Sequence, residues 1–305
     1  MTRIGFIGRT KFLFDTIIKF QKLKDYEISF IWTSQDEEFY NFGYDKFEKL
    51  AAKVNCLFIN SSNIKTHANS ISADIVVSVN FINIIPQDFI EKFKFGIINA
   101  HAGDLPRYKG NACPNWAILN QEEFVALTLH KMNSDLDSGP IIFKDKFKIK
   151  RDTYVSEIYE WLEEKIPKSF VMAVEHLCDG RSTSDQAGKT LRTFPRKPED
   201  ARLDFSKDLN WNYRLIRASS KPFDGAFAYL NNSSKKIIIY RAEPVEVKYD
   251  FLAVSGQIIE RFSEDASFLL AIGENALKIT SYSLDGLSIK KSFQVVCDSM
   301  RNRLT

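Results

Sequence analysis

Short apolar runs alternate with amphipathic segments through the first half of the chain, and this alternation limits the fold more than any other feature. Residues 73–79 form a near-continuous β-branched run, the pattern of a strand that is buried on both faces. Residues 95–100 repeat this pattern, whereas residues 11–23 place apolar side chains at helical spacing. Strands and helices that alternate in this way build right-handed βαβ units around a parallel sheet.

The same patterns continue over the other N-terminal segments. Further strands are expected at residues 3–7, 26–32, 56–59, 126–130 and 141–147, and further helices at 45–54 and 153–177. We therefore predict an α/β fold with a Rossmann-like, mostly parallel sheet and helices on both faces. Ligands of such sheets bind at the carboxyl ends of the strands, which directs attention to Arg9, residues 80–85 and residues 99–110.

The last third of the chain has a different pattern. Residues 181–200 are polar and contain one Gly and two Pro, which is typical of a linker. A helix is expected at 211–218, followed by short alternating segments at 237–242, 245–251, 256–262, 267–272 and 276–282. These segments predict a smaller β-rich, OB-like barrel. With about 150 residues per domain, the 305 residues divide into domains 1–190 and 191–305.

Composition disfavours several classes of protein. The net charge of +3 gives no indication of a nucleic-acid partner. The N-terminus lacks the apolar core of a secretory signal, and no run reaches the roughly 18 apolar residues of a membrane span, so we expect a cytoplasmic protein. Cys56, Cys113, Cys178 and Cys297 are scattered singly, without a CxxC pair, which predicts no metal site.

Two polar residues end the apolar strand at residues 95–100. Asn99 and His101 are two positions apart, so their side chains point to the same side of the strand. A histidine there can act as a general base, and the Asn99 amide can donate to an oxyanion. Asp137, in a turn before the next strand, can orient His101 or accept a proton through water. Each residue alone also fits a purely structural role.

The combination of motifs is more specific than its parts. The chain contains N-x-H, L-P-x-Y-x-G, N-W-A-I-L, T-L-H and L-D-S-G-x-I in this order over residues 99–141. This series resembles the folate-dependent formyltransferases, and segments between residues 196 and 227 resemble the start of that family's C-terminal domain. The resemblance covers most of residues 1–230 and fades after residue 245.

The resemblance implies a carrier and a set of site residues. The carrier is 10-formyltetrahydrofolate, and Asn99, His101 and Asp137 match the family's catalytic trio. The positions that match folate-binding segments are Asn83, Ile84, Ile85, Asn111, Asn133, Ser134, Asp135 and Leu136. The chain departs from many relatives in two places, with Asn111 where some have Arg and Gly103-Asp104 where many have Ser-Leu.

Three classes of acceptor amine compete, namely an initiator tRNA, a sugar nucleotide and a small free metabolite. The resemblance implies that tRNA-specific relatives carry a basic insertion after the second strand. Here residues 33–43 contain Asp36, Glu37 and Glu38, which would be repelled by phosphates. This segment argues against tRNA, and we predict that no nucleic acid is bound.

The first strand end favours a sugar nucleotide. Gly8, Arg9, Thr10 and Lys11 lie where a strand ends and a helix begins, a place where backbone N–H groups attract phosphate. Arg9 can add a bidentate contact to a diphosphate, although Arg9 and Lys11 also fit solvated surface charges. Candidates to hold the base or hexose are Phe39, Tyr40, Asn115 and Trp116, and Trp116 equally fits core packing.

These observations lead to a specific hypothesis. We predict transfer of a formyl group to a UDP- or dTDP-linked 4-amino-4,6-dideoxyhexose that is destined for a surface polysaccharide such as O-antigen or lipopolysaccharide. The alternative is a methionyl-tRNA formyltransferase, and a third reading is a non-catalytic folate- or nucleotide-binding module. A homodimer is compatible with each of these functions.

Overall fold

The computed structural model describes residues 1–34 and 42–305. The acidic residues 36–38 and the aromatic residues Phe39 and Tyr40, on which part of the acceptor argument rests, lie outside the described residues. The chain divides into two compact units. Unit 1 contains residues 1–113, 124–148 and 159–194, and unit 2 contains residues 114–123, 149–158 and 195–305.

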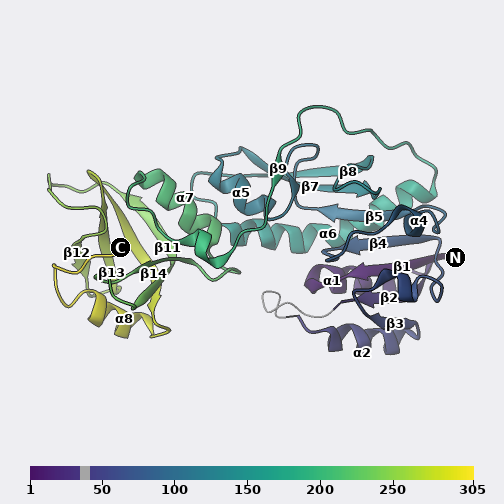
Figure 1. Cartoon of the computed structure of the whole chain (residues 1–305), viewed down its shortest axis with the longest axis horizontal. Helices are drawn as coiled ribbons and strands as arrows, with labels where there is room; N and C mark the ends of the chain where they lie inside the picture. The colour runs from purple at the N-terminus through teal and green to yellow at the C-terminus, as the bar shows by residue number, and fades with distance from the viewer. Residues whose placement is uncertain (35–41) are drawn as a thin grey trace. The chain divides into compact units, whose positions relative to one another are not determined.

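Unit 1 is built on a seven-stranded sheet with the order β3-β2-β1-β4-β5-β7-β8 (Figure 1). The strands are β1 (Thr2–Gly8), β2 (Tyr26–Thr33), β3 (Leu57–Asn60), β4 (Ile75–Val79), β5 (Ile97–His101), β7 (Phe124–Lys131) and β8 (Ile141–Lys148). The pairs from β3 to β5 are parallel, whereas β7 pairs antiparallel with both β5 and β8. The predicted mostly parallel sheet is therefore confirmed.

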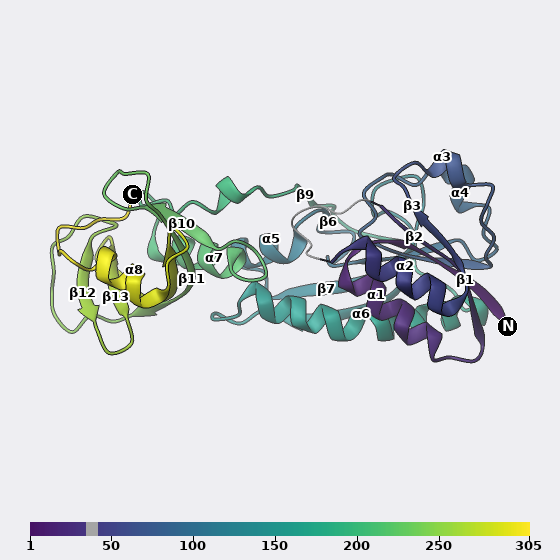
Figure 2. The ribbon, with the colours of Figure 1, turned by 90° about the horizontal axis from the view of Figure 1, so that it is seen from below.

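Helices cover both faces of this sheet, as predicted (Figure 2). The helices α1 (Thr10–Gln21), α2 (Tyr44–Val54) and α6 (Val155–Cys178) lie on one face, where the rings of Phe6 and Phe20 pack 5.6 Å apart. The short helices α3 (Ile64–His67) and α4 (Gln87–Ile90) lie on the other face, where Trp32 packs 5.9 Å from Phe89. β4 is buried along its whole length because it is covered on both sides.

Residues 181–200 are more ordered than the predicted linker. Ser184 pairs with Ile141, and β9 (Arg192–Thr193) forms a two-stranded parallel sheet with β6 (Lys109–Gly110). The 3-10 helix η2 (Pro198–Ala201) follows in unit 2. The predicted linker therefore makes backbone hydrogen bonds within unit 1, because backbone groups pair whatever the polarity of their side chains.

Unit 2 carries an antiparallel sheet with the order β10-β11-β14-β13-β12. Its elements are α7 (Leu209–Ser219), β10 (Ala226–Tyr229), β11 (Lys236–Val245), β12 (Ile258–Phe262), β13 (Ser267–Ile272), β14 (Asn275–Leu284) and α8 (Ile289–Val296). Residues 303–305 bond to both edges of the sheet, through Thr305 to Tyr229 and through Leu304 to Gly256. The edges are thus joined, in agreement with the predicted barrel-like domain.

Two details of unit 2 differ from the sequence-based prediction. The strand expected at residues 245–251 is absent from the described structure, because β11 pairs with β14 only as far as Val245. β10 and α8 were not predicted, since β10 has only four residues and gives a weak pattern.

Among the described residues, no helix combines the length and apolar character that crossing a bilayer requires.

Candidate active site

The pairing of β5 with β7 assembles the first part of the site. Asn99 lies opposite His130, and His101 lies opposite Thr128. The two β5 side chains point to the same side of the strand because they are two positions apart. His101 and His130 are 7% and 2% exposed, respectively. The strand pairing therefore places two buried imidazoles and one amide together.

Asp137 lies against this group from the turn before β8. Its Oδ2 is 3.4 Å from His101 Nδ1 and accepts a 2.9 Å hydrogen bond from the backbone N–H of Gly110. Burial raises the pKa of Asp137, but the bonds and charges of His130, His101 and Gly110 outweigh it and lower the pKa to about 2. The carboxylate is therefore ionised at every physiological pH.

His130 fixes the orientation of Asn99. His130 Nδ1 lies 2.9 Å from the carbonyl oxygen of Lys131, which can only accept, so Nδ1 carries a proton. Nε2 lies 3.2 Å from Asn99 Nδ2 and 3.7 Å from Asp137 Oδ1. In the neutral ring Nε2 accepts an N–H from Asn99, and in the imidazolium form it faces the Asp137 carboxylate. One N–H of the Asn99 amide is used in this bond, which leaves the second available for a ligand.

The other nitrogen of His101 faces the loop after β5. His101 Nε2 is 2.6 Å from the carbonyl oxygen of Tyr108 and 3.6 Å from Cys113 Sγ. Burial lowers the pKa of His101, but the hydrogen bond with Cys113 and the charge of Asp137 outweigh it, so the pKa lies above its ordinary value of 6.5. Because the Tyr108 carbonyl oxygen can only accept, His101 Nε2 carries a proton in this contact and donates it to Tyr108.

Gly103 explains how the Tyr108 carbonyl comes so close. A Cβ at position 103 would lie 2.4 Å from His101 Nε2 and 2.4 Å from the Tyr108 oxygen. A serine at this position would therefore be incompatible with this loop conformation. The departure noted in the sequence has a structural consequence at the predicted base.

The sequence of the chain matches the models of two protein families. The sequence model described as formyl transferase matches residues 50–174, and the model described as formyl transferase, C-terminal domain, matches residues 196–293. Both models match in the expected order, and the first contains Asn99, His101 and Asp137. The chain belongs to the formyltransferase family.

Individual relatives span different parts of this formyltransferase. The bifunctional polymyxin resistance protein ArnA of Wigglesworthia glossinidia brevipalpis is 30% identical over 190 residues. This match covers 60% of the chain and only 28% of the length of ArnA. The methionyl-tRNA formyltransferase of Fusobacterium nucleatum is 26% identical over 92% of the chain and 91% of its own length. An N-formyltransferase from Helicobacter canadensis, solved with folinic acid and dTDP-3-aminofucose, has a TM-score of 0.65 at 17% identity, covering 92% of this chain and 99% of its own.

The predicted folate-binding residues lie on three loops of unit 1, and all of them except Asn111 are on two of these loops. Asn83 bonds to the Ser62 carbonyl, and Ile84 is 83% exposed, whereas Ile85 is buried in the core. On the second loop, Asn133 Oδ1 accepts from Asp135 N and from Ser138 Oγ. Ser134, Asp135 and Leu136 of this loop are exposed, as is Asn111 on the loop after β5. Both loops thus present residues to solvent.

The predicted phosphate-binding residues follow β1. A Cβ at Gly8 would lie 1.9 Å from the Val79 carbonyl, so glycine is required where Arg9 N donates to that carbonyl. Arg9 Nε donates to the Asn80 carbonyl at 3.0 Å, and Thr10 is buried. Lys11 instead pairs with Asp15 and Glu163, on α1 and α6. The structure therefore brings Arg9 to the loop after β4 and turns Lys11 toward the helices.

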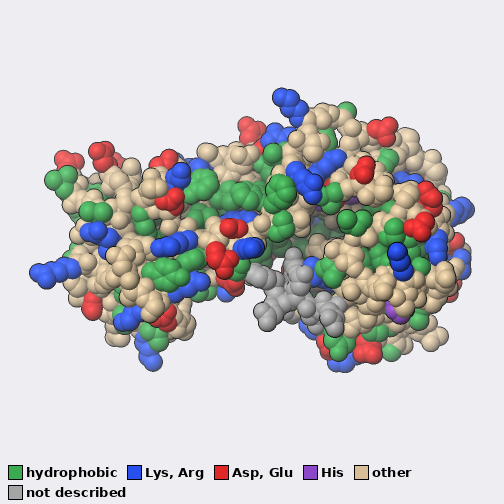
Figure 3. Space-filling model, viewed as in Figure 1, with side chains coloured by type: hydrophobic (Ala, Val, Ile, Leu, Met, Phe, Trp, Pro, Cys, Tyr) green, Lys and Arg blue, Asp and Glu red, His purple; other side chains and the backbone are tan. Residues whose placement is uncertain are grey.

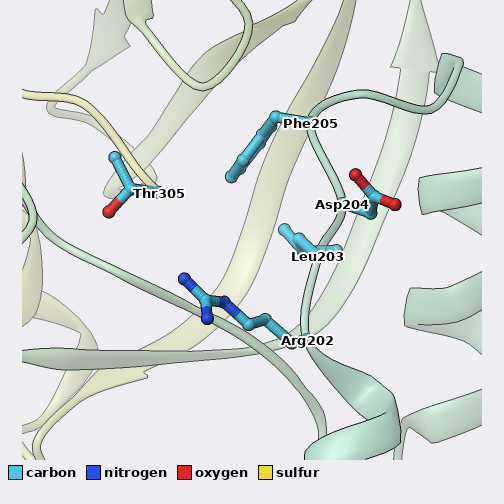
Figure 4. A pocket seen from close by; sticks show the side chains of 5 residues that line it. All are labelled: Arg202, Leu203, Asp204, Phe205 and Thr305. Atoms are coloured by element: carbon cyan, nitrogen blue, oxygen red, sulfur yellow. The ribbon is translucent and has the colours of Figure 1, made fainter.

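Asn115 and Trp116, predicted to bind the base or hexose, belong to unit 2. They lie on α5 (Cys113–Leu119). Asn115 is 4% exposed and donates to the Ala218 carbonyl at 2.7 Å, while the Arg196 guanidinium lies 5.6 Å from the Trp116 ring centre. A pocket of unit 2 is lined by Arg202, Leu203, Asp204, Phe205 and Thr305, none of them a predicted site residue (Figure 4).

Three residues of the site were missed by sequence reasoning. His130 belongs to the T-L-H motif but received no role, and Cys113 was placed among scattered cysteines. Gln186 was assigned to a linker, yet it bonds to the turn that contains Asp137. The T-L-H motif was a usable signal for His130, whereas the contacts of Cys113 and Gln186 depend on chain crossings that no local pattern records.

In the described part of the chain, no cluster of His, Cys, Asp and Glu has the geometry of a metal site.

Proposed function

We propose that this formyltransferase moves a formyl group from 10-formyltetrahydrofolate to the amine of a nucleotide-linked amino sugar. The observation that carries the proposal is the grouping of Asn99 and buried His101 at the end of β5 with Asp137, whose carboxylate lies 3.4 Å from His101. A hydrogen-bond donor, an imidazole of raised pKa and an ionised carboxylate are the groups that acyl transfer to an amine requires.

Each residue has a separate role in the proposed reaction. The acceptor nitrogen bonds to the formyl carbon, and Asn99 donates its second N–H to the oxygen that becomes negative. His101 takes the proton that the amine loses, and the charge of Asp137 stabilises the resulting imidazolium. The bond between the formyl carbon and N10 of the folate then breaks as N10 takes this proton from the His101 imidazolium. For this role Nε2 must start unprotonated, so the proton that it donates to Tyr108 in the structure passes to solvent before the reaction.

Two exposed apolar side chains support the folate assignment. Ile84 is 83% exposed and Leu136 is 48% exposed, one on each of the two predicted folate loops. Isolated apolar side chains of this size at a site edge suit the flat face of a pterin ring, and neighbouring backbone groups suit its polar edge. Folate derivatives are also bound in solved relatives of similar fold.

The choice of acceptor rests on three supports. Arg9 is at the carboxyl end of β1, where diphosphates bind in open α/β sheets. Lys and Arg side chains are interspersed with Asp and Glu on the face drawn in Figure 3, rather than gathered in the single basic field that tRNA favours. The Helicobacter enzyme of similar fold was solved with a dTDP-amino sugar. We propose a dTDP- or UDP-linked 4-amino-4,6-dideoxyhexose as the acceptor.

A methionyl-tRNA formyltransferase is the second candidate. Its support is the similarity to the Fusobacterium enzyme over nearly the full length of both chains. Competing assays distinguish the two functions. With 10-formyltetrahydrofolate as the donor, we expect dTDP- or UDP-amino sugars to be formylated at least about a hundredfold faster than charged initiator tRNA at equal concentrations. Comparable rates on both acceptors would contradict the sugar-nucleotide assignment.

Replacement of Arg9 tests the phosphate site. For Arg9→Ala we expect the KM for the sugar nucleotide to rise roughly tenfold, because a charge-assisted hydrogen bond contributes about 1.5–3 kcal/mol. The KM for the folate should change much less. The measurement is a pair of titrations, each with the other substrate saturating.

Lys11→Ala is the matched control, since Lys11 pairs with Asp15 and Glu163 and should leave both constants unchanged. An unchanged acceptor KM for Arg9→Ala would remove Arg9 from the phosphate site. An equal rise in both constants would indicate that Arg9 acts through its bond to Asn80 instead.

A further inference from the structure

Residues 182–194, here called the strap, bond to both loops that surround the candidate catalytic residues. Ser184 exchanges two backbone hydrogen bonds with Ile141, of 2.8 and 2.9 Å, just after the Asp137 turn. Further along, β9 pairs with β6 beside Gly110, whose N–H bonds to Asp137. The strap therefore bonds to the chain on either side of the candidate catalytic residues, at Ile141 and at β6, although its sequence indicates a linker.

One side chain of the strap contacts the Asp137 turn directly. Gln186 Nε2 donates to the carbonyl oxygen of Asp137 and to that of Gly139, both at 2.8 Å. Both partners are carbonyl oxygens, which can only accept, so the orientation of the Gln186 amide is fixed. Gln186 Oε1 is buried and has no hydrogen-bond partner in the described part of the chain. The side-chain amide is thus held by its two N–H groups.

The turn that these bonds hold has a backbone that needs support. Asp137 has φ +48°, a left-handed conformation that costs a residue with a Cβ some free energy. Gly139 packs so closely that a Cβ there would lie 1.8 Å from the Lys131 carbonyl. In this conformation the Asp137 carboxylate reaches both His101 and the Gly110 N–H. A small rotation of the turn would move the carboxylate away from His101.

We propose that Gln186 is a positioning residue, which holds the Asp137 carboxylate beside His101 by bonding to the carbonyls of residues 137 and 139. This inference rests on the proposed function, because it gives Asp137 a catalytic reason to be held. It also assigns the strap a role in the active site in addition to its role as a connection between the units.

Replacement of Gln186 by Leu keeps the size of the side chain and removes both bonds. For Gln186→Leu we expect kcat to fall about tenfold to a hundredfold, which is the effect of two lost hydrogen bonds, while KM for both substrates changes less than about twofold. Gln294→Leu is the matched control, because Gln294 is exposed on α8, and it should leave kcat unchanged. A rise in KM with unchanged kcat would overturn the proposal.

The Glu variant separates bonding from packing. In Gln186→Glu a carboxylate would face two carbonyl oxygens, so we expect a lower kcat than for Gln186→Leu at pH 8. Protonation of that Glu restores one donor, so the ratio of kcat for the Glu variant to kcat for the Leu variant should rise as the pH falls. A ratio that is independent of pH would show that Gln186 only fills space.

A titration of His101 by NMR tests the proposal without any assay of activity. His101 is faced by Asp137 from the turn, by Cys113 from α5 and by His130 from β7. In Gln186→Leu the carboxylate is released, so the His101 midpoint should move to lower pH by about half a unit or more. An unchanged midpoint would overturn the proposal. If the wild-type protein formylates no amino sugar but this midpoint still moves, the proposed function fails and the positioning role stands.

Discussion

His101→Ala and Asn99→Ala are expected to lose kcat by at least about a hundredfold to a thousandfold while the protein stays folded. His101→Ala removes the imidazole that we propose takes the amine proton, and Asn99→Ala removes the amide that contacts His130 and that we propose donates to the oxyanion. Loss of one preorganised oxyanion donor costs about 10²–10³ in kcat. The measurement is kcat and KM for the best amino-sugar acceptor at saturating folate.

The control for these variants is binding. Both should retain the folate affinity of the wild-type protein, because neither residue is on the predicted folate loops. Both should still unfold cooperatively, and His101→Ala should do so at a lower temperature, since it removes a buried ring that pairs with Asp137. His176→Ala provides a matched histidine change outside the site, since His176 is on α6 and its Nε2 lies 2.7 Å from the Ser182 carbonyl oxygen. Retention of more than about a tenth of wild-type kcat/KM, a loss below about 1.4 kcal/mol, would remove that residue from the mechanism.

Asp137→Asn is expected to lower kcat on the order of a thousandfold and to shift the pH profile. The Asp137 charge raises the pKa of His101, so its removal should lower that pKa. His101 must be neutral to accept a proton, and the wild-type rate should therefore fall as the pH drops through a value above 6.5. In the Asn variant this acidic limb should move to lower pH, although the maximum rate is smaller.

The measurement is kcat/KM between pH 5 and pH 9 for the wild-type protein and for Asp137→Asn. Asp137 itself does not titrate in this range, because its pKa is lowered to about 2. An acidic limb that stays in place, or that moves to higher pH, would exclude the proposed coupling between the two groups. Asp88→Asn, an exposed change on α4 outside the predicted site residues, should leave the limb unchanged.

The low pKa of Asp137 also affects stability. A carboxyl whose pKa falls from 3.8 to about 2 on folding stabilises the native state above pH 3.8 by about 2 kcal/mol. This contribution is lost as the pH falls toward 2. Asp137→Asn should therefore lower the unfolding free energy at pH 7, and the difference from wild type should shrink with acid.

The amino-acid sequence by itself determined the framework of this protein. Near-continuous β-branched runs identify strands that are buried on both faces, and the spacing of Asn99 and His101 puts their side chains on one side because strands have a period of two. Gly8 and Arg9 follow a strand end for similar local reasons. These features are encoded within a few residues, so local patterns are sufficient to predict them.

The tertiary structure alone decided which residues surround His101. His130 meets Asn99 because β7 pairs antiparallel with β5 in one register, and a shift by one residue would turn His130 to the other face. Gln186 meets Asp137 across 49 residues, and Cys113 meets Thr193 across 80. Such contacts depend on how distant segments cross in space. Their donors and acceptors are common residue types without a local pattern, and for this reason only the folded chain shows them.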